Sequence, residues 1–180
     1  AVVVVATVRA LKNHGGVAKA DLGTENLEAL EKGLPNLLRH VENVTKVFGL
    51  PCVVAINRSP LDTEAELALI ESKCKELGVN VALSEVWAKG GEGGKALAEE
   101  VVRLCEQSKP YTPSYALESS IEEKLTAIVT KIYRGSKVEL TPNAKKQAKQ
   151  LTEQGFGNYP ICMAKTQYSF SDNAALLGAP

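Results

Sequence analysis

Several features are missing from this 180-residue sequence, and each absence narrows the classes of protein that it fits. No apolar run approaches the length of about 20 residues that spans a bilayer, and no segment resembles a signal peptide. Net charge is absent too, because 21 Lys and Arg residues balance 21 Asp and Glu residues, so the overall charge does not favour nucleic acid or an anionic membrane. The four cysteines form no CxxC pair, which argues against disulfides and zinc. We therefore expect a soluble, cytoplasmic protein with no metal site and with neither a membrane nor a nucleic acid as partner.

Three short runs rich in β-branched residues predict buried strands: AVVVVA (1–6), CVVAI (52–56) and VNVALS (79–84). The first run is continuous, which is typical of a strand covered on both faces in a parallel sheet. Helical patterns separate the runs, and strands that alternate with helices predict right-handed βαβ crossovers. The sequence therefore predicts an α/β fold, a parallel sheet with flanking helices.

The helical stretches carry recognisable start and stop signals. Apolar residues at helical spacing fill residues 25–48, and we expect Gly33 and Pro35 to divide this stretch into two helices. Thr63 and Glu66 predict a capping box that opens the next helix. A further helix is expected over residues 95–106.

A linker-like segment, QSKPYTPSY (107–115), suggests a boundary near residue 110. We predict two domains: residues 1–109, the parallel α/β part, and residues 110–180, a smaller C-terminal α/β segment. The second domain should contain helices over about residues 120–134 and 142–154. A turn, a short strand and a polar loop should follow in GFGNYPICMAKTQYSFSD (155–172).

Each predicted strand runs into a polar or glycine-rich segment that reads as a loop: ATVRALKNHGG (6–16), INRSPLD (56–62) and SEVWAKGGEGG (84–94). Ligands of open parallel sheets bind beyond the carboxyl ends of the strands, so these segments should converge on one crevice. Arg9 and Lys12 could meet a phosphate or a carboxylate there. The alternative is that both side chains cap the sheet edge and pair with acidic neighbours.

The segment KGGEGGKA is not a phosphate-binding P-loop, because Lys89 stands where the first Gly belongs and Ala96 where the Ser or Thr belongs. Its glycines should let the backbone approach a ligand or lead into the next helix. Trp87, the single Trp of the chain, precedes them. Its indole could stack on a planar heterocycle, although the residues alone favour a place in the core.

Six segments together resemble the formate–tetrahydrofolate ligase family, from end to end of the chain: VATVRALKNHGG, TENLEALEKGLPNL, VVAIN, DTEAEL, SEVWAKGGEGG and GFGNYPICMAKTQYSFSD. The segment KTQYSFSD resembles the single-function bacterial enzymes of the family more than the trifunctional eukaryotic ones, which tend to carry His in place of Gln167. The resemblance implies a P-loop-like fold and a ligase that makes 10-formyltetrahydrofolate from formate, tetrahydrofolate and ATP through formyl phosphate. It also implies magnesium, a monovalent cation and a homotetramer.

The same resemblance suggests site residues. Trp87 matches the family tryptophan that stacks on the pterin, Leu83 matches a pocket neighbour, and Ser59 stands where the family has a second stacking aromatic. Arg9, Lys12, His14, Gly15 and Gly16 match the family's signature segment without individual roles, His14 being most simply a structural hydrogen-bonding residue. No catalytic residue is assigned.

The family's ATP phosphate loop has no counterpart in these 180 residues, and the first residue is not Met. We therefore expect a fragment that carries the pterin-binding side of the ligase and is inactive alone. The alternative is a non-catalytic α/β subdomain that binds a ligand or makes oligomer contacts.

Overall fold

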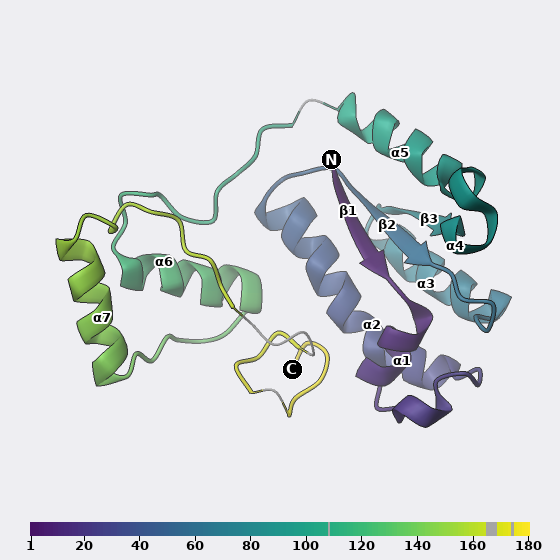
Figure 1. Cartoon of the computed structure of the whole chain (residues 1–180), viewed down its shortest axis with the longest axis horizontal. Coiled ribbons are helices and arrows are strands. Elements are labelled where there is room, and N and C mark those ends of the chain that lie inside the picture. Colours follow the sequence, from purple (N-terminus) through teal and green to yellow (C-terminus); the bar gives the residue numbers. More distant parts are fainter. Residues whose placement is uncertain (108, 165–168, 174) are drawn as a thin grey trace. The chain divides into compact units, whose positions relative to one another are not determined.

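The computed structural model describes residues 1–107, 109–164, 169–173 and 175–180 (Figure 1). The chain divides into two compact units, of which the first combines Ala1–Tyr111 with Thr166–Pro180 and the second spans Thr112–Lys165. The predicted domains, residues 1–109 and 110–180, stay a prediction. In the described parts of the chain, no helix is both long enough and apolar enough to cross a membrane.

The first unit is built on a three-stranded parallel sheet in the order β1-β2-β3, which confirms the predicted α/β fold (Figure 1). Its strands are β1 (Val2–Ala6), β2 (Cys52–Asn57) and β3 (Asn80–Ser84). In this register Val3 lies opposite Val53, and Val53 lies opposite Asn80. The P-loop-like topology stays a prediction.

Helices cover both faces of this sheet. On one face a core cluster joins β1 and β2 to three helices: α1 (Val8–His14), α2 (Leu27–Glu42) and α3 (Glu64–Glu76). On the other face α5 (Lys95–Cys105) packs Leu104 against Val53 and Ala82.

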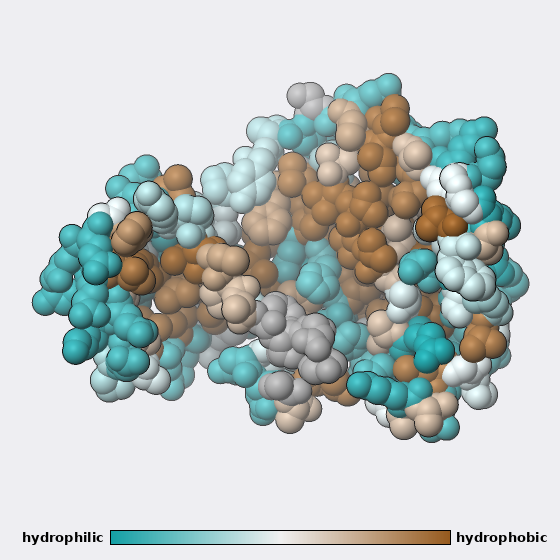
Figure 2. Space-filling model, in the orientation of Figure 1, coloured by the Kyte–Doolittle hydropathy of each residue, from teal (hydrophilic) through white to brown (hydrophobic). Residues whose placement is uncertain are grey.

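The central strand β2 is buried on both faces, but β1 lies at the edge of the sheet. Its Val3 and Val5 are 39% and 66% exposed, so the predicted cover on both faces of the first strand is wrong. Val3 lies beside Val53, on the face of the sheet that α5 covers. The physical reason for the exposure is that α5 contacts β2 and β3 and leaves β1 open on that face. Figure 2 shows apolar residues gathered at the surface over this part of the unit.

The expected division of residues 25–48 into two helices is also wrong, because α2 runs unbroken through Gly33 and Pro35. At Gly33 helix α2 approaches α1 closely, since a Cβ there would lie 1.8 Å from the carbonyl oxygen of Leu11. Proline costs an interior helix about 3 kcal/mol. Burial of one face of α2 offsets that cost, through Leu30, Leu34, Leu37 and Val41. A π-helical turn, η2 (Asn43–Val47), prolongs the helix.

Two further local predictions for this unit are confirmed, the helix over residues 95–106, which is α5, and the capping box. The Glu66 N–H donates to Thr63 Oγ1 at 3.2 Å and the Thr63 N–H donates to Glu66 Oε2 at 3.1 Å, which confirms the capping box of α3. Short helical segments complete the unit: η1 (Lys19–Asp21), α4 (Val86–Lys89) and η3 (Gly90–Gly94).

The second unit contains α6 (Ile121–Ile128), prolonged by the π-helical turn η4 (Val129–Tyr133), and α7 (Pro142–Glu153). Both helices agree with the predicted ones. The buried Lys124 of α6 donates to the carbonyl oxygens of Gly157 and Tyr159, at 2.6 and 3.0 Å.

The described residues of the segment 155–172 form no strand, only an isolated bridge at Ser169, and residues 165–168 lie outside the described chain.

Candidate functional site

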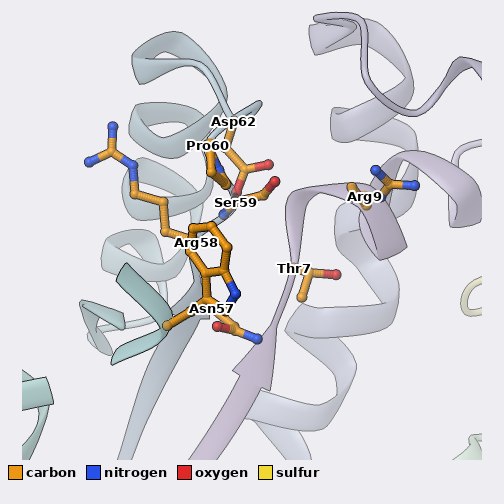
Figure 3. Close-up of a pocket in the computed structure, with 8 residues that line it drawn as sticks. Thr7, Arg9, Asn57, Arg58, Ser59, Pro60 and Asp62 are labelled. Carbon is orange, nitrogen blue, oxygen red and sulfur yellow. Dashed lines mark hydrogen bonds between the residues drawn. The ribbon is translucent and has the colours of Figure 1, made fainter. Parts of the chain in front are cut away.

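A pocket of about 460 Å³ opens at the carboxyl ends of β1 and β2 (Figure 3). All three segments that follow the strands contribute to it, as expected for a parallel sheet. The lining comprises Thr7 and Arg9 from α1 and its cap, the residues Asn57, Arg58, Ser59, Pro60 and Asp62 after β2, and Trp87 from α4.

The wall after β1 is a short helix and not the loop that the sequence suggested. Thr7 caps α1, because the Ala10 N–H donates to Thr7 Oγ1 at 3.1 Å. Within α1, Val8 and Leu11 are buried on the face that packs against the core. Arg9 therefore lies on the outer face of α1, where it is exposed and lines the pocket.

The wall after β2 is a turn fixed by its own side chains. The Ser59 N–H donates to Asp62 Oδ2 at 2.8 Å, and the Asp62 N–H donates to the Ser59 carbonyl oxygen at 3.0 Å. Asp62 is buried, whereas Asn57 is exposed at the end of β2. Arg58 pairs with Glu64 and lies 3.6 Å from a carboxylate oxygen of Glu85. The turn is therefore preorganised, and the charge of Arg58 is already compensated.

The third wall carries Trp87, whose side chain is 78% exposed. This exposure excludes the core position that the residues alone favoured. The glycines that follow serve the chain's own turn. The Glu85 N–H donates to the Gly93 carbonyl oxygen at 3.0 Å, and a Cβ at Gly93 would lie 2.4 Å from the Glu85 carbonyl oxygen. The short helix α4 thus holds Trp87 at the pocket, and the turn that follows α4 needs a glycine at position 93.

Lys12 lies in the core and not in the pocket. Its Nζ lies 2.8 Å from Glu66 Oε1 and donates to the Thr24 carbonyl oxygen at 2.8 Å, and both charged side chains are at most 1% exposed. Burial raises the pKa of Glu66, but hydrogen bonds from Lys12 and from two backbone N–H groups outweigh this effect and leave that pKa below its ordinary value. For Lys12 the structure thus matches the alternative in which it pairs with an acidic residue.

The other predicted residues lie apart from the pocket lining. Leu83 of β3 packs against the main core, and His14 Nε2 lies 3.4 Å from the side-chain amide of Asn36. Gly15 lies where α1 meets α2, since a Cβ there would approach the Ala29 carbonyl oxygen to 1.8 Å, and Gly16 has a φ of +98°. The assignment of Leu83 to the folate site stays a prediction, and no role was assigned to the other three residues.

Sequence reasoning did not single out Thr7, Asn57, Arg58, Pro60 or Asp62 as site residues. Their signal was position, because all five directly follow predicted strands, and such positions in parallel sheets form ligand crevices. No group of three or more His, Cys, Asp or Glu side chains in the described residues could hold a metal ion.

The chain matches the family model described as formate–tetrahydrofolate ligase over residues 1–180, its whole length. This family comprises ligases whose substrates are formate, tetrahydrofolate and ATP. The match agrees with the resemblance carried by the signature segment and by the segment around Trp87. The chain belongs to the formate–tetrahydrofolate ligase family.

Proposed function

We propose that this chain supplies the tetrahydrofolate-binding side of an enzyme that forms 10-formyltetrahydrofolate. In the proposed reaction a formate oxygen attacks the γ-phosphorus of ATP, which gives formyl phosphate and ADP. The N10 nitrogen of tetrahydrofolate then attacks the formyl carbon, phosphate leaves and N10 loses a proton. The observation that carries the proposal is the exposed indole of Trp87 beside a pocket at the carboxyl ends of the strands.

The chemistry of the pocket supports a flat, polar heterocycle as its occupant. An indole face stacks on such a ring with about 1 kcal/mol beyond the buried area. The side-chain amide of Asn57, exposed at the end of β2, lines the same pocket and offers a donor and an acceptor for the C=O and N–H groups at the edge of a pterin. Because Ser59 stands where the family has a second aromatic, Trp87 would provide the aromatic stacking from one face only.

Phosphoryl transfer is not part of what we propose for the isolated chain. A P-loop stabilises the transferred phosphoryl group through backbone N–H groups and a lysine, and the spacing of KGGEGGKA does not provide one. We propose that the complete enzyme is a cytoplasmic homotetramer that binds ATP together with magnesium. We propose that it also binds a monovalent cation. The described residues offer no metal-binding cluster, so no step is assigned to a metal on this chain. Accordingly, the purified 180-residue chain should make no 10-formyltetrahydrofolate from the three substrates.

The proposal is tested by calorimetric titration of tetrahydrofolate into the chain and into two variants of Trp87. Trp87→Ala should weaken binding about fivefold or more, because it removes the stacking face, and Trp87→Phe should restore most of the affinity. Val102→Ala is the matched control, because Val102 is also exposed but lies on α5 and does not line the pocket.

The result that would contradict the proposal is a folded Trp87→Ala chain that binds tetrahydrofolate as tightly as the wild type. Retention of the far-ultraviolet circular dichroism spectrum shows that the variant is folded. Loss of the fold is not expected, because a side chain that is 78% exposed contributes little buried area.

A further inference from the structure

Four cationic side chains, those of Arg9, Lys12, Arg58 and Lys89, lie in the segments that follow the strands, and three of them form ion pairs. Lys89 of α4 pairs with Glu85 at 2.7 Å. Lys12 is directed into the core, where it pairs with the buried Glu66. Arg58 lines the pocket but pairs with Glu64 and lies close to Glu85. Lys12 is thus buried away from any ligand, and Arg58 already has two carboxylate partners.

Arg9 differs from the other three. It lines the pocket from the exposed side of α1, and no carboxylate within the described residues forms an ion pair or a hydrogen bond with its guanidinium. Figure 3 shows Arg9 on α1, across the pocket from Ser59 and Asp62. The carboxylate of Asp62 is engaged by the Ser59 N–H at 2.8 Å and is buried in its own turn. Arg9 therefore lines the pocket with no carboxylate partner of its own among the described residues.

We infer that Arg9 is the anion-binding residue of this pocket and takes a carboxylate or phosphoryl group of the substrate on its guanidinium. A guanidinium presents paired N–H donors that match two oxygens of either group. The inference rests on the proposed function and deepens it, because it assigns a role to a residue of the signature segment. The anion has two possible sources: the glutamate carboxylates of tetrahydrofolate, or a phosphoryl group such as that of formyl phosphate.

The experiment titrates three probes into the purified chain and into Arg9→Gln and Arg9→Lys. Tetrahydrofolate carries the pterin and the glutamate, 6-methyltetrahydropterin carries the pterin alone, and inorganic phosphate carries only the phosphoryl oxygens. Arg103→Gln is the matched control, because Arg103 lies on α5 and is bound to Glu100 outside the pocket. Arg9 is exposed, so its variants should unfold at the same temperature as the wild type.

We expect Arg9→Gln to weaken binding of an anionic probe about tenfold or more, because a hydrogen bond to a charged group is lost. Arg9→Lys should recover part of the affinity, since an ammonium keeps the charge without the paired donors. If tetrahydrofolate loses affinity and 6-methyltetrahydropterin does not, the anion is the glutamate carboxylate. If phosphate binding alone is lost, the anion is the phosphoryl group.

The inference is overturned if Arg9→Gln binds tetrahydrofolate and phosphate as the wild type does, or if the wild type binds neither probe. Its failure is separable from that of the proposed function. Tetrahydrofolate binding that depends on Trp87 but not on Arg9 leaves the proposed function standing and removes this inference. Phosphate binding that depends on Arg9, without tetrahydrofolate binding that depends on Trp87, does the reverse.

Discussion

Replacing Lys12 with methionine removes the cation from a buried ion pair that joins three helices. Lys12 lies on α1, and Glu66 lies in the first turn of α3. The Glu66 carboxylate also accepts hydrogen bonds from the N–H groups of Asn26, which caps α2, and of Thr63, each at 3.1 Å. Because α1 and the turn before α3 form two walls of the pocket, this ion pair holds those walls in register.

The magnitude follows from burial. With its side chain 0% exposed, Glu66 would keep a charge with no cation beside it, and breaking a buried pair in this way costs about 3–5 kcal/mol. That is a large share of the roughly 5–15 kcal/mol that stabilises a typical domain. The double variant Lys12→Met/Glu66→Gln should be less destabilised than Lys12→Met, because no unpaired charge remains in the core.

Urea unfolding followed by circular dichroism measures the difference. Lys32→Met is the matched control, because Lys32 pairs with Glu28 at 2.6 Å on the surface of α2, where such pairs contribute about 0–1 kcal/mol. A loss below about 1 kcal/mol for Lys12→Met, comparable to the control, would refute the assignment of this pair as a structural centre of the unit.

Three further predictions concern acid, thiols and one glycine. Glu66 has a lowered pKa in the folded state, so its charge should stabilise the fold above about pH 4.5 and cease to do so as the pH falls through the folded-state pKa. The free energy of unfolding, measured from pH 6 to 3, should therefore fall more steeply for the wild type than for Glu66→Gln. Parallel curves for the two proteins would contradict this prediction. Cys52 and Cys74 are buried, which raises the pKa of both thiols to about 11, whereas Cys105 and Cys162 are exposed. A thiol reagent at pH 8 should therefore modify two of the four cysteines in the native chain and all four in urea. Rapid modification of all four in the native chain would contradict the burial of Cys52 and Cys74. Gly33→Ala should lower the free energy of unfolding by about 1–3 kcal/mol in the same urea assay, because its Cβ would force α1 away from α2; Gly23→Ala, whose Cβ would meet only Leu61 at 3.5 Å, is its control, and equal effects would argue against the close helix contact.

The strands and most helices were predictable because their signals are local. The short β-branched runs form the three parallel strands, and Thr63 and Glu66 form the capping box. The continuous course of α2 through Pro35 was not predictable in this way. It depends on burial of one face of α2 against strands and helices that are distant in the chain and are brought near only by folding.

The candidate site shows the same limit at the level of single side chains. Arg9 and Lys12 carry equal charge in one segment, yet one is exposed and the other buried. Their separation follows from α1, because a helix places Val8, Leu11 and Lys12 on its inner face. Taken as a loop, the segment gave no such distinction. The partner Glu66 lies 54 residues beyond Lys12, and no local pattern predicts that pairing.

Fluorescence of Trp87 tests the central claim most directly, because it is the single tryptophan of the chain and lines the pocket. If the pterin stacks on its indole, tetrahydrofolate should quench this fluorescence saturably, with a midpoint equal to the calorimetric dissociation constant. 6-Methyltetrahydropterin should also quench it saturably, whereas formate should not. A chain that binds tetrahydrofolate by calorimetry while Trp87 fluorescence stays unchanged, after correction for absorption by the ligand, would contradict the account.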